Sequence, residues 1–272
     1  MPRRPLNCFA SAALLICIGV FHAAVSSGSE IEVKHKEGLI HGFLLLSTLE
    51  GNPLANGDLI QTAQGDEVTI RLAYHFKDGS LQDETTVFTQ NGKFRLVRYH
   101  IIQKGPAFPR TIEMTVIASS GQVTVHYTDG DGKEKDATEH MKLPPDLANG
   151  LVLTFLKNLG SDTPPVEVGM IVATPKPRLV RLAISPEGSE PFSLGAEKLK
   201  ATRYVVKVEI GGVAGLLAPL LGKQPTDSHI WILGGKGPAF VKSEVLSYFG
   251  GPMWRTELAV PVWPRPATTA PK

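Results

Sequence analysis

Regular alternation of apolar and polar residues is the feature that most limits how this chain can fold. The clearest stretch covers residues 67–76. Its apolar face consists of Val68, Ile70, Leu72, Tyr74 and Phe76. A period of two is the pattern of a β-strand with one buried face. The chain is therefore expected to be built mainly from strands.

Five segments with this pattern follow one another between residues 66 and 128, separated by short turn signals. Glycine and asparagine supply the backbone conformations that tight turns need. The phase of one segment shifts between Leu96 and Val97, which indicates a bulge. The turn signals are Asp78-Gly79, Asn91-Gly92, Gly105-Pro106 and Ser120-Gly121. This region is predicted to be a five-stranded antiparallel meander.

Further strands are predicted in the second half of the chain, at residues 166–173, 179–184, 203–210, 230–233 and 255–260. In one of them the alternating set Tyr204, Val206, Val208 and Ile210 is expected to face inward. One helix is expected from Asp146 to Asn158, because two prolines precede it and apolar residues recur at intervals of four within it.

Together these elements predict a mainly β fold: a long, curved antiparallel sheet, forming an open or half barrel, closed by one short helix. Two related halves are possible, because Lys104–Phe108 is repeated as Lys236–Phe240. Coincidence between two Gly-Pro turns explains this repeat more simply, because the flanking sequences share little similarity. We expect a meander with a helix at 27–160, a β-rich half of the same or a second domain at 161–260, and a Pro-rich tail at 261–272.

Residues 1–26 have the organisation of a secretory signal peptide. Arg3 and Arg4 precede an uncharged apolar run, and small residues follow it up to Ser26, after which we expect cleavage. A retained N-terminal anchor is the alternative. Cleavage would remove both cysteines, Cys8 and Cys17, and the chain has no Asn-x-Ser/Thr site. This combination predicts a bacterial periplasmic or secreted protein.

The charge balance argues against a nucleic-acid partner. Removing Arg3 and Arg4 from the 28 basic residues leaves the same number as the 26 acidic residues. A chain that binds a phosphate backbone needs a clear excess of basic residues. We therefore predict no nucleic-acid binding.

Three histidines beside tyrosines, His75, His100 and His126, are the candidates for a metal or acid–base site. In the predicted meander they lie on alternate strands, about 9–10 Å apart. A zinc ion needs ligand atoms about 2 Å away. We therefore predict no metal site and no cofactor, although strong curvature of the sheet would allow these histidines to converge.

No sequence motif identifies a catalytic residue. A zinc-protease helix and a serine-hydrolase turn motif are both missing. Asp83, Glu84 and Glu113 are possible members of a glycosidase carboxylate pair, but solvated charges at the strands explain them more simply. We therefore predict no catalytic residues and lean towards a protein that is not an enzyme.

The apolar and aromatic residues of the second half of the chain favour a binding site for an apolar ligand over a metal or catalytic site. Residues 211–222 form an uncharged, glycine-rich apolar segment, and aromatic residues follow it closely. The segment is either a mobile apolar loop or a buried piece of the core. Aromatic and aliphatic side chains of this kind line ligand pockets. The predicted ligand-binding residues are Tyr74, Tyr99, Leu216, Leu217, Trp231, Phe240 and Trp254.

The order of these elements resembles uncharacterised exported bacterial families of unknown function. Their architecture is similar to the open β-barrels of the periplasmic lipoprotein-localisation and lipid-carrier proteins. The resemblance covers about residues 39–160. It rests on the segments Tyr74–Phe76, Asp78-Gly79, Tyr99–Gln103, Gly121–Tyr127 and Leu143–Gly150. It implies a curved sheet with a helical plug, and it carries over no individual functional residue.

The sequence therefore predicts an exported cell-envelope protein that binds or carries an apolar or amphipathic ligand, such as a lipid, without catalysis. Two alternatives remain open. One is an envelope hydrolase that acts on an ester or a glycan through residues distant in sequence. The other is a structural or assembly protein that adds a strand to an envelope protein partner.

Overall fold

The computed structural model describes residues 28–194, 197–209 and 225–259. Within them, fourteen strands form one antiparallel sheet, and one short helix, α1 (Val152–Asn158), packs against it. The expected signal segment, the whole Pro-rich tail at 261–272, Ile210 and the apolar segment with Leu216 and Leu217 lie outside the described residues. None of the helical structure described is long and apolar enough to cross a bilayer.

The first eight strands form a meander in which each strand pairs with the next along the chain. The five strands predicted between residues 66 and 128 are confirmed as β3 to β7. The predicted bulge is confirmed too, because the pairing of β4 with β5 shifts register beside Leu96. The bounds are β1 (Ile40–Thr48), β2 (Pro53–Gln64), β3 (Glu67–Phe76), β4 (Leu81–Asn91), β5 (Lys93–Lys104), β6 (Ile112–Ile117), β7 (Gln122–Thr128) and β8 (Glu134–His140).

The last six strands form a second meander. It joins the first where β1 pairs with β14, with Leu44 opposite Leu258. The sheet order is therefore β8-β7-β6-β5-β4-β3-β2-β1-β14-β13-β12-β11-β10-β9. The bounds are β9 (Val166–Val172), β10 (Arg178–Leu194), β11 (Glu197–Glu209), β12 (Ser228–Leu233), β13 (Ala239–Leu246) and β14 (Met253–Leu258).

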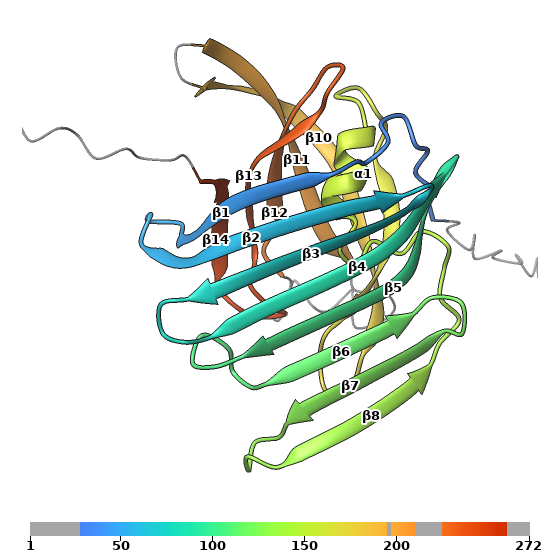
Figure 1. Cartoon of the computed structure of the whole chain (residues 1–272), viewed down its shortest axis with the longest axis vertical. Coiled ribbons are helices and arrows are strands. Elements are labelled where there is room, and N and C mark those ends of the chain that lie inside the picture. The colour runs from blue at the N-terminus through green and yellow to red at the C-terminus, as the bar shows by residue number, and fades with distance from the viewer. Residues whose placement is uncertain (1–27, 195–196, 210–224, 260–272) are drawn as a thin grey trace, which may run out of the picture.

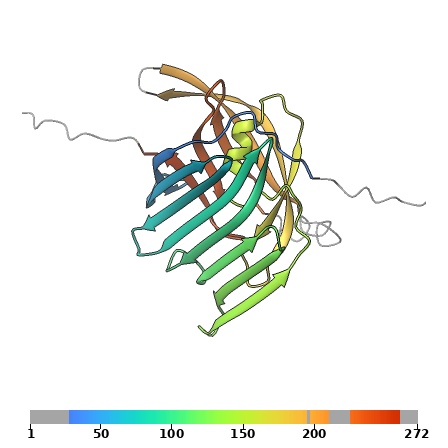
Figure 2. The same cartoon turned by 45° about the vertical axis from the view of Figure 1, so that its right-hand side comes forward.

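The sheet curls around α1 but does not close. Figure 1 shows β1 to β8 spread across one side of the molecule and β9 to β14 turning behind them, with α1 in the space between. Figure 2 shows the same arrangement from a second direction. The terminal strands β8 and β9 do not pair with each other. The predicted open or half barrel is therefore confirmed, and we call its inner side the concave face.

The two edges of the sheet differ in how they are protected. The β9 edge is covered by the segment before α1, because the Ala148 amide donates to the Gly169 carbonyl and the Gly169 amide donates to the Asp146 carbonyl. The β8 edge carries charged side chains along an exposed strand. Charge on an edge strand disfavours pairing with another chain.

The helix begins later than the sequence predicted. Residues 146–151 do not belong to α1, which starts at Val152. Gly150 has φ of +66°, a left-handed conformation that interrupts a helix. Asp146 does not act as a helix cap, because its carboxylate forms an ion pair with Arg181 at 2.9 Å. The predicted Asp146–Asn158 helix was therefore wrong at its start and right at its end.

Apolar side chains on the concave face form two clusters. The larger cluster lies around α1, where Phe155 and Leu156 pack among strand residues such as Phe88 and Met114. The smaller cluster lies around Phe76, Phe108 and Trp254, and its other buried members are Leu44, Leu46, Ala55 and Tyr74. The inward set predicted for the strand at 203–210 is confirmed for Tyr204, Val206 and Val208, which all join the larger cluster.

Each copy of the repeated five-residue segment spans a turn between consecutive strands. The copy that ends at Phe108 follows β5, and the copy that ends at Phe240 precedes and enters β13. Both phenylalanines pack against the smaller cluster. Descent of the two halves from a common ancestor remains a prediction.

Candidate functional site

Period-two geometry divides the side chains of β4 between the two faces of the sheet. Phe88, on the concave face, is fully buried, and Glu84 lies in phase with it. Asp83 faces the opposite, convex side, where Arg71 donates two hydrogen bonds to it at 2.6 and 3.1 Å. This ion pair lowers the pKa of the Asp83 carboxyl. Two adjacent carboxylates therefore lie in opposite environments.

Glu84 has apolar neighbours in a row across the concave face. Leu72 on β3 lies directly opposite it on one side, and Ile101 on β5 lies opposite it on the other. Leu59 on β2 continues this row beyond Leu72. Leu59, Leu72 and Glu84 are partly exposed, whereas Ile101 is buried. We call the partly exposed part, Leu59–Leu72–Glu84, the open row.

The Glu84 carboxylate is unpaired within the part of the chain that the structure describes. No hydrogen bond or ion pair joins it to a described residue. Burial raises the pKa of this carboxyl to about 7, because desolvation disfavours the charged form. The residue is also partly exposed to solvent, on the concave side of β4. Glu84 is therefore a polar group presented to the inside of the half barrel.

The segment before α1 lies directly over this part of β4. A Cβ atom built on Gly150 would lie 1.8 Å from the Thr86 hydroxyl oxygen and 3.0 Å from the Glu84 Oε1. Glycine at this position thus allows the backbone to approach β4 closely. The floor of the site is the sheet, and the 146–151 segment forms part of its roof.

Two of the predicted ligand-binding residues, Tyr74 and Tyr99, lie on the concave face close to Glu84. Tyr99 is opposite Thr86, and Tyr74 is opposite Gln82, so the two tyrosines flank Glu84 diagonally. Both hydroxyl groups are buried, and burial raises the pKa of each, with the Glu84 charge as a further cause. The structure therefore places both tyrosines on the strands that flank Glu84, at diagonal positions.

The Tyr74 hydroxyl also joins the two meanders. It lies 3.2 Å from the Thr256 hydroxyl oxygen on β14, within hydrogen-bonding distance. Its ring packs over Gly57, where an added Cβ would lie 2.6 Å from the ring edge. Tyr74 is thus held in place with its hydroxyl directed toward β14, on the side of β3 away from β4.

The other predicted ligand-binding residues lie elsewhere. Trp254 and Phe240 belong to the smaller apolar cluster, or pack against it, at one end of the concave face. Trp231 points to the convex side, where its indole N–H donates to Glu190 at 2.8 Å and Lys242 lies 4.0 Å from its ring centre. The structure does not bring Trp231 together with the tyrosines.

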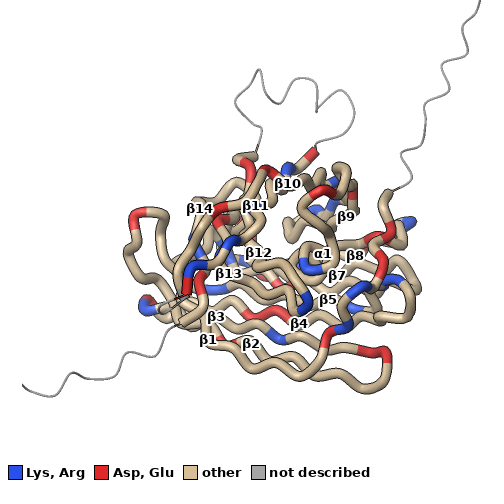
Figure 3. Tube along the Cα trace, turned by 90° about the horizontal axis from the view of Figure 1, so that it is seen from above, with Lys and Arg blue, Asp and Glu red and all other residues tan. Residues whose placement is uncertain are grey.

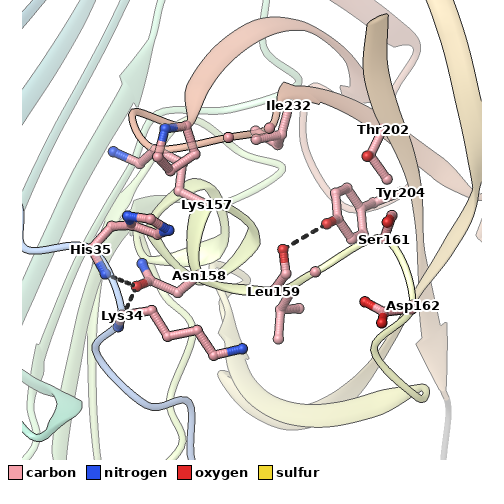
Figure 4. Close-up of a pocket in the computed structure, with 14 residues that line it drawn as sticks. Lys34, His35, Lys157, Asn158, Leu159, Ser161, Asp162, Thr202, Tyr204 and Ile232 are labelled. Carbon is pink, nitrogen blue, oxygen red and sulfur yellow. Dashed lines mark hydrogen bonds between the residues drawn. The ribbon is translucent and has the colours of Figure 1, made fainter.

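A polar pocket of about 280 Å³ opens at the C-terminal end of α1. Figure 4 shows its walls: Lys34 and His35 on one side, Asn158 to Asp162 below α1, and Tyr204 opposite them. The Tyr204 hydroxyl donates to the Leu159 carbonyl at 2.8 Å, and the Asn158 side chain accepts two backbone hydrogen bonds from the Lys34–His35 segment. Its polar groups are therefore largely engaged in holding the fold.

A second, more apolar pocket of about 250 Å³ lies at the edge of the smaller cluster. Leu54, Phe76, Ala107 and Trp254 contribute its apolar walls. Both pockets are smaller than the roughly 300–1,000 Å³ of most small-molecule sites. Neither pocket alone explains the binding of a ligand.

The histidines of the meander do not converge. His75 on β3 is exposed, His100 lies 2.9 Å from Glu113, and His126 pairs with Asp136, all on the convex face. The described residues contain no group of three metal-binding side chains. The hydrogen bonds of His100 and His126 go to the carboxylates of Glu113 and Asp136, not to a serine hydroxyl. The carboxylates of Asp83, Glu84 and Glu113 are also divided, because only Glu84 faces inward.

Acidic and basic residues are interspersed around the molecule, as the coloured trace in Figure 3 shows. The ion pairs of the convex face, such as Arg71–Asp83 and Arg255–Glu244, join opposite charges on neighbouring strands. The concave side of β1 to β7 and β12 to β14 differs, because Glu84 is the only charged residue at an inward position of these described strands.

Fold and site together define an open, helix-plugged β half barrel with an unpaired acidic side chain, Glu84, on the inner face of its described strands. No family model matches the chain, and no curated protein matches it significantly. One solved structure is similar: a β-barrel-like protein of the domain of unknown function DUF1849 from Brucella abortus. The two chains are 9% identical, the match covers 81% of this chain and 94% of the other, and the TM-score is 0.44. Both proteins are rich in β-structure, and no residue role is carried over.

Proposed function

We propose that this chain is an exported cell-envelope protein that binds an amphipathic ligand on its concave face without catalysing a reaction. The open row is the observation that carries this proposal. Leu59 and Leu72 remain accessible to solvent on the inner side of a curved sheet, where apolar side chains are normally covered. An apolar chain lying along them would remove this surface from water.

The amount of surface sets the affinity that we expect. Burying a leucine side chain completely is worth about 1.5–3 kcal/mol. Because Leu59 and Leu72 are already partly buried, covering both adds only a few kcal/mol. Micromolar affinity requires about 8 kcal/mol. The ligand must therefore also contact other inner groups, and we expect micromolar rather than nanomolar binding.

The experiment compares two tryptophan substitutions on opposite faces of neighbouring strands. Leu72→Trp fills the open row, whereas Val87→Trp adds the same side chain to the convex side of β4. Binding of the neutral fluorescent probe N-phenyl-1-naphthylamine is measured for the wild type and both variants. We expect Leu72→Trp to weaken binding at least tenfold and Val87→Trp to leave it within twofold of the wild type.

Native mass spectrometry of the protein purified from a bacterial envelope provides an independent test. A bound amphipathic molecule that is lost in the Leu72→Trp variant supports the proposal. A wild-type protein that carries no ligand and shows no affinity for the probe would contradict it. N-terminal sequencing of the same material tests export, because cleavage near Ser26 would expose a new N-terminus.

A further inference from the structure

Glu84 has no positively charged partner among the described residues, and the lysine of the plug helix, Lys157, is paired with Glu37 instead. Arg71 on β3 and Arg98 on β5 are the nearest basic residues on the flanking strands, and both occupy convex positions. Arg71 is already paired with Asp83. On the roof, Asp146 adds a second acid, whose partner is Arg181. The protein therefore presents an inward carboxylate and supplies no cation for it.

An unpaired carboxylate is an unusual group to keep on an apolar wall. A buried charge is normally paired or neutralised, because its desolvation is costly. Leucine or glutamine would fit the same strand position without that cost. The Thr86 hydroxyl lies beside the carboxylate under Gly150, and the buried Tyr99 hydroxyl is close enough for the Glu84 charge to raise its pKa. These oxygens and the carboxylate can all accept hydrogen bonds.

From this arrangement we infer that the ligand is a cationic amphiphile, an apolar chain carrying an amine, and that Glu84 binds its ammonium group. This inference rests on the proposed binding function and names the class of ligand for the same site. An ammonium group has three donors and no acceptor. It complements the carboxylate in charge and the surrounding oxygens in hydrogen bonding. The apolar chain would lie along Leu72 and Leu59.

The same geometry disfavours fatty acids. A ligand carboxylate beside Glu84 would place two negative charges together in a poorly solvated space, which costs free energy unless a proton is taken up. A neutral alcohol gains the apolar contacts and one hydrogen bond but no charge pairing. The expected order of affinity is therefore amine, alcohol, carboxylate.

The test uses three probes with the same chain: dodecylamine and dodecanoate below their micelle concentrations, and dodecanol below its solubility limit. Affinities are measured by displacement of N-phenyl-1-naphthylamine at pH 8, above the pKa of about 7 at which Glu84 loses its proton. We expect wild-type protein to bind dodecylamine at least tenfold more tightly than dodecanoate. In Glu84→Gln the two affinities should differ by less than threefold.

Glu113→Gln is the matched control, because Glu113 lies on the convex face beside His100. This variant should keep the wild-type preference. Lowering the pH from 8 to 5.5 should weaken dodecylamine binding to wild type at least fivefold and leave Glu84→Gln unchanged. The thermal melting of each variant confirms that it is folded.

The outcomes separate the two proposals. If dodecanol and dodecanoate bind but dodecylamine has no advantage, or if Glu84→Gln keeps the preference, the inference about the amine is wrong and the binding function stands. If none of the three probes binds folded wild-type protein, the binding function fails and this inference fails with it.

Discussion

The stability of this protein should decrease as the pH rises through the range in which Glu84 ionises. Burial raises the pKa of this carboxyl from 4.5 to about 7. A group whose pKa is raised on folding binds protons more tightly in the folded state than in the unfolded state. Its contribution to stability is complete below pH 4.5 and is lost between pH 4.5 and about 7.

The size of the effect follows from the two pKa values. They differ by about 2.5 units, and each unit corresponds to about 1.36 kcal/mol. The free energy of unfolding should therefore fall by about 3 kcal/mol between pH 4.5 and pH 8 through this one residue. Glu84→Gln removes the ionisation and should abolish this part of the pH dependence.

Urea denaturation followed by tryptophan fluorescence provides the measurement. At pH 4.5 the variant and the wild type should have similar free energies of unfolding, because both side chains are then neutral. At pH 8 the variant should be more stable by about 3 kcal/mol. A difference between the two proteins that stays constant from pH 4.5 to 8 would refute the assignment of Glu84 to a desolvated position.

The neighbouring residue, Asp83, provides a control, because its effect on stability should change with pH in the opposite direction. Asp83 is paired with Arg71, and its pKa is lowered. Its stabilising contribution is present above the unfolded pKa and is lost as the pH falls through the folded pKa. Asp83→Asn should therefore destabilise the protein at pH 8, by about 1 kcal/mol or less because the pair lies at the surface. This loss should shrink at acidic pH.

Two further substitutions test the segment that covers the site. Asn149→Ala removes a side chain that both donates to the Ile171 carbonyl and accepts from the Ile171 amide, each at 2.8 Å; we expect a loss of about 2–4 kcal/mol in urea denaturation, because both backbone groups are left unsatisfied. Gly150→Ala should lower stability by about 2–3 kcal/mol, because the new Cβ would lie 1.8 Å from the Thr86 hydroxyl oxygen at a left-handed φ. Gly132→Ala is its control, with a similar φ but open space around it, and should cost about 1 kcal/mol; equal losses in the two variants would show that the close approach has no energetic effect.

The central meander could be predicted from sequence because two independent signals agree there. Inward residues such as Val68 and Phe88 alternate along their strands with outward residues. Turn signals such as Asn91-Gly92 separate the strands where the structure has its turns. Each strand has one buried and one solvated face, so the hydrophobic pattern records the register directly. The open half barrel follows from a run of such strands with one helix.

Other strands carried no such signal. β8 is exposed on both faces, so its polar residues show no apolar period. β2 contains Asn56-Gly57, which reads as a turn, yet Gly57 lies inside the strand because the Tyr74 ring packs against it. β10 continues through Pro186, beyond which its pairing with β11 shifts register. In each case tertiary contacts outweigh the local preference.

The site was only partly predictable for a related reason. Tyr74 and Tyr99 occupy apolar phases of their strands, so they could be assigned to the inner face. Glu84 was interpreted together with Asp83 as a surface charge. Its phase relative to Phe88 on the same strand places it inward, but the polar run before Phe88 hides this signal. The two-residue alternation of the sequence also cannot show which inward side chains stay exposed to solvent after folding.

The pairing of β1 with β14 has a consequence for how the molecule is made. Its two strands come from opposite ends of the described chain, so this ladder forms only after β14 has been synthesised. Until then β1 and β13 each keep one open backbone edge that a neighbouring chain can occupy. Contacts between residues so far apart in sequence also slow folding. Assembly of this protein therefore depends on β14. Truncation before Met253 should leave two separate half-sheets, each with an exposed and aggregation-prone edge strand, rather than a smaller stable protein.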